Sequence, residues 1–321
     1  MRASRIAVLS LIGLFLVGAA AVLLLRMPEP ATVTDGIAAR HPGDIGIETD
    51  PDVFFVERFD EGTIASLVAR YEDVLNQGDL SFVADVPSGS AASNSLLMTA
   101  VGGARSGAHL FKNLAADGRA QDDTVYLRYY VKYRSPFTPH HNGVWMGGAN
   151  PPRDWPNPQA GTRPAGDDRF IVATEPVTST MRLDNYVYWK DMHSDPNGNY
   201  WGNDFLQDAG LRAPLDEWMC VETMVKLNNP VTTSNGELAF WINGAKKNHL
   251  GPGFPRGSWI WDSFHPGNGS AFPGFQWRTD PALNLNWIWL EHYADNTPAG
   301  QESQMQLAHV VAARSYVGCL S

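Results

Sequence analysis

The chain contains two neighbouring segments in which apolar and polar residues alternate, Trp218–Asn228 and Glu237–Ile242. Their apolar positions are Met219, Val221, Val225, Leu227, Leu238, Phe240 and Ile242, and Thr223 interrupts that series. Successive side chains of a β-strand point to opposite faces, so this alternation predicts two strands that each have one buried face. The second segment ends in Asn-Gly, a dipeptide typical of tight turns between strands. Together the two segments predict a sheet that has one face buried in a core.

The rest of the chain also favours β-structure. Its 321 residues include 22 Pro and 30 Gly, which separate many short segments, and patterns with a helical period are nearly absent. Further strands are expected at 53–59, 80–84, 95–99, 108–111, 125–133, 170–174, 180–189, 286–293 and 305–313. A long irregular segment, Phe137–Asp168, is expected to form a wall or lid over a groove. The composition does not change after residue 53, which predicts one domain over residues 53–321, a two-sheet antiparallel sandwich.

The N-terminus has the pattern of an export or anchoring segment. Two arginines precede a largely apolar run at 6–25, which is long enough to span a bilayer. We expect residues 1–26 to be a signal anchor that binds the membrane, and residues 27–52 to be a flexible tether. A cleaved signal peptide is the alternative, because three alanines at 19–21 offer a cleavage site. Both alternatives place the domain outside the cytoplasm, in the cell envelope or secreted.

The balance of charge limits the classes of partner. The chain has 34 Asp and Glu residues against 24 Lys and Arg residues. Binding to nucleic acid needs a basic face that neutralises phosphates, so nucleic acid is not expected as a partner. An anionic polymer would need a local basic cleft within this acidic protein.

A motif in the two alternating segments is similar to one in known proteins. Trp-x-Cys-x-Glu-x-x-x-Lys-Leu-Asn at 218–228, followed by Gly-Glu-Leu-x-x-Trp-x-Asn-Gly at 236–244, resembles jelly-roll proteins of the concanavalin-like group, particularly the alginate and glucuronan lyases. The segments 127–133, 185–192 and 310–319 agree with this resemblance. It implies an all-β jelly-roll sandwich that binds an anionic polysaccharide. A purely structural envelope protein is the alternative that a closed and apolar concave face would favour.

The two cysteines, Cys220 and Cys319, are expected to form a disulfide. Exported proteins mature in an oxidising compartment, and a bond that closes a loop of about 100 residues stabilises by about 4.7 kcal/mol in the chain-entropy model. Two unpaired buried thiols are the alternative. Neither cysteine has the spacing of a metal site.

Two expected strands carry the candidate catalytic residues. Alternation places Arg128, Tyr130 and Lys132 on one face of the first strand, and Tyr186, Tyr188 and Lys190 on one face of the second. Cleavage of a uronate polymer by β-elimination needs a base, an acid and a group that neutralises the carboxylate. The sequence predicts Tyr188 as base and acid, Lys190 or Lys132 as helper, and Arg128 or His141 as neutralising group. The alternative is that these side chains form cross-strand pairs that only stabilise the sheet.

Other residues are candidates for binding. The expected substrate-binding residues are Tyr130, Tyr186, Glu222, Trp241 and Arg153, with Trp241 stacking on a sugar ring. Asp191, Asp195 and Asn197 form an oxygen-rich loop that offers ligands for a structural Ca²⁺, although it lacks the glycine and terminal Glu of an EF-hand. No cofactor is required for the expected reaction.

The sequence therefore predicts a polysaccharide lyase-like protein that acts on an acidic polysaccharide. A non-catalytic carbohydrate-binding or adhesive module of the cell envelope is the alternative from another class. Hydrolysis is disfavoured, because the Glu-x-Asp-x-x-Glu strand usual in glycoside hydrolases of this fold is absent.

Overall fold

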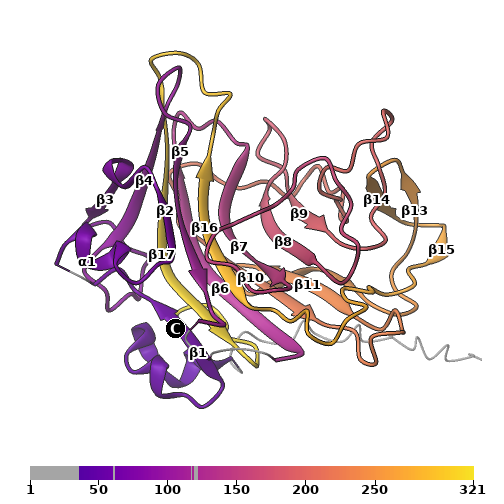
Figure 1. Cartoon of the computed structure of the whole chain (residues 1–321). Coiled ribbons are helices and arrows are strands. Elements are labelled where there is room, and N and C mark those ends of the chain that lie inside the picture. The colour runs from indigo at the N-terminus through magenta and orange to yellow at the C-terminus, as the bar shows by residue number, and fades with distance from the viewer. Residues whose placement is uncertain (1–35, 61, 117, 119–121) are drawn as a thin grey trace, which may run out of the picture. The chain divides into compact units, whose positions relative to one another are not determined.

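Two antiparallel sheets, one of eight strands and one of six, hold most of the described chain, and a third sheet has three short strands (Figure 1). The computed structural model describes residues 36–60, 62–116, 118 and 122–321. The all-β, two-sheet antiparallel architecture predicted from the sequence is confirmed, and a jelly-roll sandwich fits it. The predicted signal anchor at 1–26 lies outside the described residues. Within the described residues, no helix has the length and apolar character needed to cross a bilayer.

The larger sheet contains the two alternating segments that predicted a hairpin. Its strands, in spatial order, are β12 (Ala245–Leu250), β11 (Glu237–Ile242), β10 (Met219–Lys226), β6 (Thr124–Arg134), β17 (Glu302–Ala313), β4 (Ser95–Val101) and β3 (Leu80–Val83), with β1 (Val53–Glu57) paired to β17. Strands β10 and β11 pair in antiparallel register, with Glu222 opposite Trp241. The hairpin is confirmed.

The smaller sheet includes a strand that the sequence did not predict. Its strands, in spatial order, are β2 (Asp73–Leu75), β5 (Gly107–Asn113), β16 (Trp287–Tyr293), β7 (His141–Ala149), β8 (Arg169–Pro176) and β9 (Leu183–Tyr188). Strand β7 lies inside the segment expected to be irregular. Its glycines weaken the strand pattern, and Gly147 is needed because a Cβ there would lie 2.2 Å from the Trp287 ring.

The remaining elements are short. The third sheet consists of β13 (Arg256–Ile260), β14 (Ser263–Pro266) and β15 (Ser270–Ala271), and the helices are α1 (Ile64–Val68) and 3-10 turns at Ile37–Arg40, Pro42–Asp44, Ile47–Thr49 and Gln77–Asp79. Figure 1 shows the third sheet beside β9, and a bridge between Asp204 and Ser263 joins it to the segment that follows β9.

The core lies between the two large sheets. Residues such as Leu127 and Val131 of β6 and Leu290 of β16 are fully buried there. Hydrogen bonds also join the sheets, because the Tyr129 hydroxyl on β6 donates to the Thr174 carbonyl on β8 over 2.8 Å. One face of the smaller sheet is thus used for the core, and its opposite face is available for a binding site.

Residues 36–52 differ from the expected flexible tether. They form three 3-10 turns that pack on the larger sheet, and Ile37 and Ile47 are buried against Val311 and Val317. Asp44 is also buried, where it binds Arg128. These contacts fix the segment, so the ordered domain begins before residue 53.

The expected disulfide is confirmed. Cys220 of β10 and Cys319 near the C-terminus are bonded, and their Cα atoms lie 6.1 Å apart. The bond ties the last residues of the chain to the outer face of the larger sheet.

Candidate functional site

A cleft of about 800 Å³ lies on the face of the smaller sheet that is turned away from the core. Strands β7, β8, β9 and β16 supply its floor, and the segment after β9 supplies part of its wall, including Trp201 and Asp204. Such a concave surface, with aromatic side chains and a few polar groups, is the usual form of a binding site.

Strand register places the functional side chains of the cleft in neighbouring rows. On β16 and β7, Trp289 is opposite Trp145, Glu291 is opposite Gly143, and Tyr293 is opposite His141. Alternation then puts every second residue of each strand on the cleft face. The cleft floor therefore combines an aromatic part with an ionisable part only a few residues away.

Glycine at position 143 leaves two carboxylates of this floor without a side chain between them. Its φ is +152°, and a Cβ built there would lie 2.9 Å from the Tyr129 hydroxyl oxygen, which favours glycine at this position. Because glycine has no side chain, none from this position of β7 stands between Glu291 on one neighbouring strand and Glu175 on the other. The two carboxylates face the same cleft.

Glu175 and His141 form a hydrogen-bonded pair. The Nδ1 atom of His141 lies 3.1 Å from Oε1 of Glu175, and the backbone N–H of Asn142 donates to Oε2 over 2.9 Å. Glu175 is buried, while His141 is half-buried and lines the cleft. A carboxylate in this position favours the tautomer of His141 that carries its proton on Nδ1, which leaves Nε2 as the basic nitrogen.

Two tyrosines of β9 complete the group. The hydroxyl oxygens of Tyr186 and Tyr188 are 3.3 Å apart, and the Tyr186 ring lies 4.9 Å from the His141 ring. Burial raises the pKa of both phenols, most strongly for Tyr186. Both tyrosines are therefore protonated at neutral pH and can donate a proton.

Glu291 is the second carboxylate of the cleft. It is only 7% exposed, and its Oε2 atom has no hydrogen-bond partner among the described residues. The nearest basic atom is Nδ1 of His109 on β5, 3.6 Å from Oε2. Burial, and to a smaller degree the charge of Glu175, raises the pKa of Glu291 well above its usual range. Glu291 therefore favours its neutral form.

Aromatic rings line the floor and the wall of the cleft. The buried rings of Trp145 and Trp289 are 5.2 Å apart in an edge-to-face contact, whereas Trp201 at the wall is 43% exposed. The apolar face of a pyranose packs well on an exposed ring such as that of Trp201. At the same wall, burial and the neighbouring Asp184 raise the pKa of Asp204 to about 7.

The cleft carries little positive charge. Among the described residues that line it, none is Lys or Arg, and the basic side chains are His140 and His141. With respect to its described lining residues, this cleft is therefore not the basic cleft expected for an anionic polymer.

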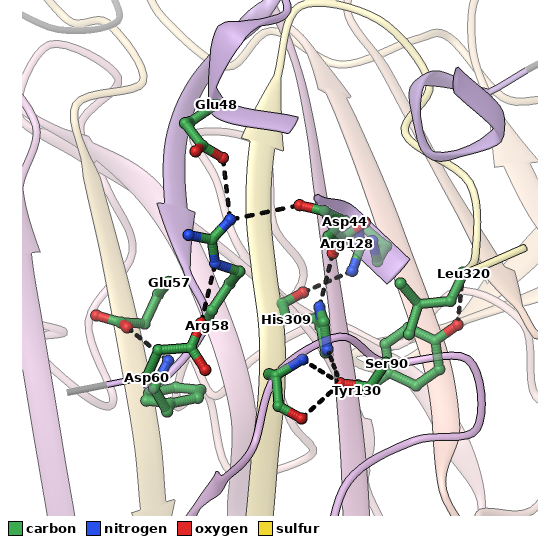
Figure 2. Close-up of polar contacts among 12 residues, drawn as sticks. Asp44, Glu48, Glu57, Arg58, Asp60, Ser90, Arg128, Tyr130, His309 and Leu320 are labelled. Atoms are coloured by element: carbon green, nitrogen blue, oxygen red, sulfur yellow. Dashed lines mark hydrogen bonds and ion pairs between the residues drawn. The ribbon is translucent and has the colours of Figure 1, made fainter. Parts of the chain in front are cut away.

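The structure brings together only part of the predicted site. His141, Tyr186 and Tyr188 line one cleft. Arg128 and Lys132 do not join them, because β6 belongs to the larger sheet. Figure 2 shows Arg128 bound to Asp44, beside His309. Arg128 and Tyr188 therefore lie on different sheets.

Lys132 and three predicted binding residues also lie on the larger sheet, away from the cleft. Lys132 binds the carboxylate of Asp85. The Tyr130 hydroxyl accepts a hydrogen bond from the Leu320 N–H (Figure 2). Glu222 accepts hydrogen bonds from the N–H groups of Val317 and Gly318, and Trp241 packs on Tyr126 and Tyr316. These side chains hold the C-terminal segment and the sheet together.

Two further predicted residues lie near the smaller sheet without lining the main cleft. Lys190 follows β9 and binds Asp191 over 2.6 Å. Arg153 lines a much smaller cavity beside Trp155 and Trp287.

The expected calcium loop uses its oxygens internally. Asp195 accepts hydrogen bonds from the N–H groups of Asn197 and Asn199 and from the Trp201 indole. In the described part of the chain, no group of three or more His, Cys, Asp and Glu side chains is arranged to hold a metal ion. The Ca²⁺ site at Asp191, Asp195 and Asn197 stays a prediction.

Glu175 and Glu291 of the cleft floor were not among the residues predicted from the sequence. Glu175 is the penultimate residue of the buried strand β8, and Glu291 lies in the apolar run Trp287–Tyr293. A charged residue inside an otherwise apolar strand is the signal that could have identified them, because such burial is costly unless it serves a function.

Solved structures with a similar fold include alginate lyases. Aly36B has 13% identity, a TM-score of 0.54, and a match covering 83% of this chain and 98% of that chain. The enzyme vAL-1 from Chlorella virus has 12% identity and a TM-score of 0.52, and the match covers 82% of this chain and 100% of that enzyme. The PL-14 alginate lyase from Aplysia kurodai has 11% identity and a TM-score of 0.53, and the match covers 82% of this chain and 99% of that enzyme.

These similarities show the fold. The protein has the jelly-roll sandwich of the alginate lyases, as the sequence resemblance implied. An Aly36B variant in complex with alginate tetrasaccharide matches with 13% identity and a TM-score of 0.50, covering 83% of this chain and 95% of that chain. No protein-family profile and no curated protein sequence matches the chain.

Proposed function

We propose that this protein is a polysaccharide lyase that cleaves a uronate polymer by β-elimination in the cleft of the smaller sheet. The observation that carries the proposal is the group of His141, Glu175 and Tyr188 that lines one cleft. The fold shared with alginate lyases supports the same substrate class.

The geometry supports specific roles for the base and the acid. Nε2 of His141 takes the proton from C5 of the uronate, and Glu175 stabilises the imidazolium that forms. The C5 electrons form the C4=C5 double bond as the bond from C4 to the departing oxygen breaks. That oxygen takes a proton from Tyr188, which regains one from His141 through solvent. Tyr188 is thus the acid, and His141 replaces it as the base expected from the sequence.

The cell envelope or the exterior is the proposed location. The disulfide between Cys220 and Cys319 supports it, because such bonds persist in oxidising compartments. Membrane attachment through residues 1–26 remains part of the proposal.

One observation favours the alternative, a non-catalytic carbohydrate-binding module. None of the described residues lining the cleft is Lys or Arg, so a neutral polysaccharide would bind without electrostatic repulsion from Glu175.

The experiment is an assay for unsaturated products, followed by their ultraviolet absorbance, with alginate and glucuronan as substrates. His141→Ala and Tyr188→Phe are each expected to lower kcat by about 10²–10⁴-fold. Tyr130→Phe is the matched control on the other sheet and should keep full activity. Binding of polysaccharide without any product between pH 5 and pH 9 would contradict the lyase and favour the binding module.

A further inference from the structure

Glu291 lines the cleft from β16, where His109 of β5 and Gly143 of β7 lie opposite it on the two neighbouring strands. It is more than nine-tenths buried, and its Oε2 atom has no hydrogen-bond partner among the described residues. A buried polar atom without a partner is costly, so a ligand that supplies one would be bound favourably.

The ionisable groups around Glu291 do not supply a permanent positive charge. His109 faces it from β5, and the Nε2 atom of His109 is bonded to Asp73 of β2 over 2.9 Å. From β7 and β8 the groups are His141 and Glu175, and Tyr293 follows on the same strand. Burial lowers the pKa of His109, so that imidazole is neutral at neutral pH.

We propose that Glu291 acts as a neutral carboxylic acid that donates its proton in a hydrogen bond to the carboxylate of the bound uronate. This inference rests on the proposed function. It adds to that function by assigning the group that neutralises the charge of the substrate carboxylate. The acid takes the place of the Lys or Arg that the cleft lacks. As C5 loses its proton, negative charge grows on the substrate carboxylate, and the hydrogen bond from Glu291 strengthens.

The burial of Glu291 supports this role. Burial and the charge of Glu175 keep the proton on Glu291 to a higher pH than an exposed glutamate would allow. An ionised Glu291 would instead repel the uronate. Substrate binding is therefore linked to one proton, and the cleft binds uronates more weakly as the pH rises.

Two measurements on the whole protein test the proposal. Calorimetric titration of alginate tetrasaccharide and of a glucuronan oligosaccharide, in two buffers with different ionisation enthalpies, counts the protons taken up on binding between pH 5 and pH 9. The pH profile of kcat/KM is measured in parallel. The variants are Glu291→Gln, Glu291→Ala and His109→Gln, with Glu302→Gln as a control at an exposed position on β17.

The wild-type protein and the His109→Gln and Glu302→Gln variants are expected to take up close to one proton on the alkaline side of the profile. Glu291→Gln, whose amide stays neutral and can donate, is expected to take up none. It should keep kcat/KM within about tenfold of the wild type at low pH and extend activity to higher pH, whereas Glu291→Ala should lose activity.

The outcomes separate the two proposals. Proton uptake without cleavage supports the role of Glu291 in binding and overturns β-elimination. Cleavage by a wild-type protein that takes up no proton at any pH overturns the role of Glu291 and leaves the lyase intact. A Glu291→Gln variant as inactive as Glu291→Ala, with an unchanged melting temperature, also overturns it. Absence of binding to either oligosaccharide overturns both.

Discussion

Arg128 and Asp44, 84 positions apart in the sequence, form a buried ion pair in which Nη2 of Arg128 lies 2.8 and 2.7 Å from the two carboxylate oxygens (Figure 2). Arg128 also donates to the His309 carbonyl, and Nδ1 of His309 lies 2.8 Å from Asp44. The pair therefore fastens the segment before β1 to the centre of the larger sheet. The role of this ion pair is structural. Arg128, which the strand pattern had placed among the catalytic candidates, is used to hold Asp44 and does not reach the cleft of the smaller sheet.

Removal of one member of this pair should strongly destabilise the domain. Asp44→Ala leaves the Arg128 guanidinium buried without its partner, and we expect the free energy of unfolding to fall by about 3–5 kcal/mol. Arg40→Ala, which breaks the more exposed pair with Asp50, should cost less than about 1 kcal/mol. Urea unfolding of both variants measures the difference. Equal effects would show that Asp44 does not anchor the segment.

The disulfide should stabilise the domain measurably. Cys220 and Cys319 are 99 positions apart, and loss of such a bond costs about 3–5 kcal/mol. Unfolding of the wild type with and without a reductant, compared with a Cys220→Ser/Cys319→Ser variant, tests this. If the reduced and oxidised proteins unfold at the same urea concentration, the prediction is wrong.

The sequence predicted the elements whose signal is local. The alternation in β10 and β11 and the placement of Tyr186 and Tyr188 on one strand face follow from residue order alone. The pairing of the two cysteines was predicted differently, from the oxidising compartment of an exported protein. Strand β7 was missed because its glycines fit against the rings and backbone of neighbouring strands, a requirement that arises only from packing.

The site was predicted only in part, because it depends on which strands share a sheet. Tyr188 of β9 and Arg128 of β6 have similar strand patterns, and only the strand order separates them. His141 meets Glu175 because β7 and β8 are neighbours. Such neighbours are set by packing across the whole domain, which a local pattern does not contain.

Glu175 should support catalysis by orienting the imidazole of His141 and stabilising the imidazolium that forms. Glu175→Gln removes the carboxylate that orients the imidazole and stabilises its charged form, so kcat should fall by about 10²–10⁴-fold while KM changes little. Thermal melting separates this loss from misfolding. A folded variant with wild-type kcat would remove Glu175 from the mechanism.

Mild acid should destabilise the domain through His292 before it affects Asp44. The neutral His292 ring accepts from the Asn142 amide at Nδ1 and donates to the Ser303 carbonyl at Nε2, and burial lowers its pKa to about 4. The folded pKa lies below the unfolded value of about 6.5, so stability is complete above pH 6.5 and is lost as the pH falls toward 4, by about 3 kcal/mol in total.

The contribution of Asp44 is lost in a lower pH range. Burial alone would raise the pKa of Asp44, but Arg128 and His309 lower it below its usual value of 3.8, so its contribution disappears only at more acidic pH. Urea unfolding at intervals from pH 7 to pH 3 should therefore show a first decline above pH 4. His292→Gln should reduce that decline, whereas His265→Gln on the third sheet should leave it unchanged. An equal decline in the His292→Gln variant would assign the acid sensitivity to another group.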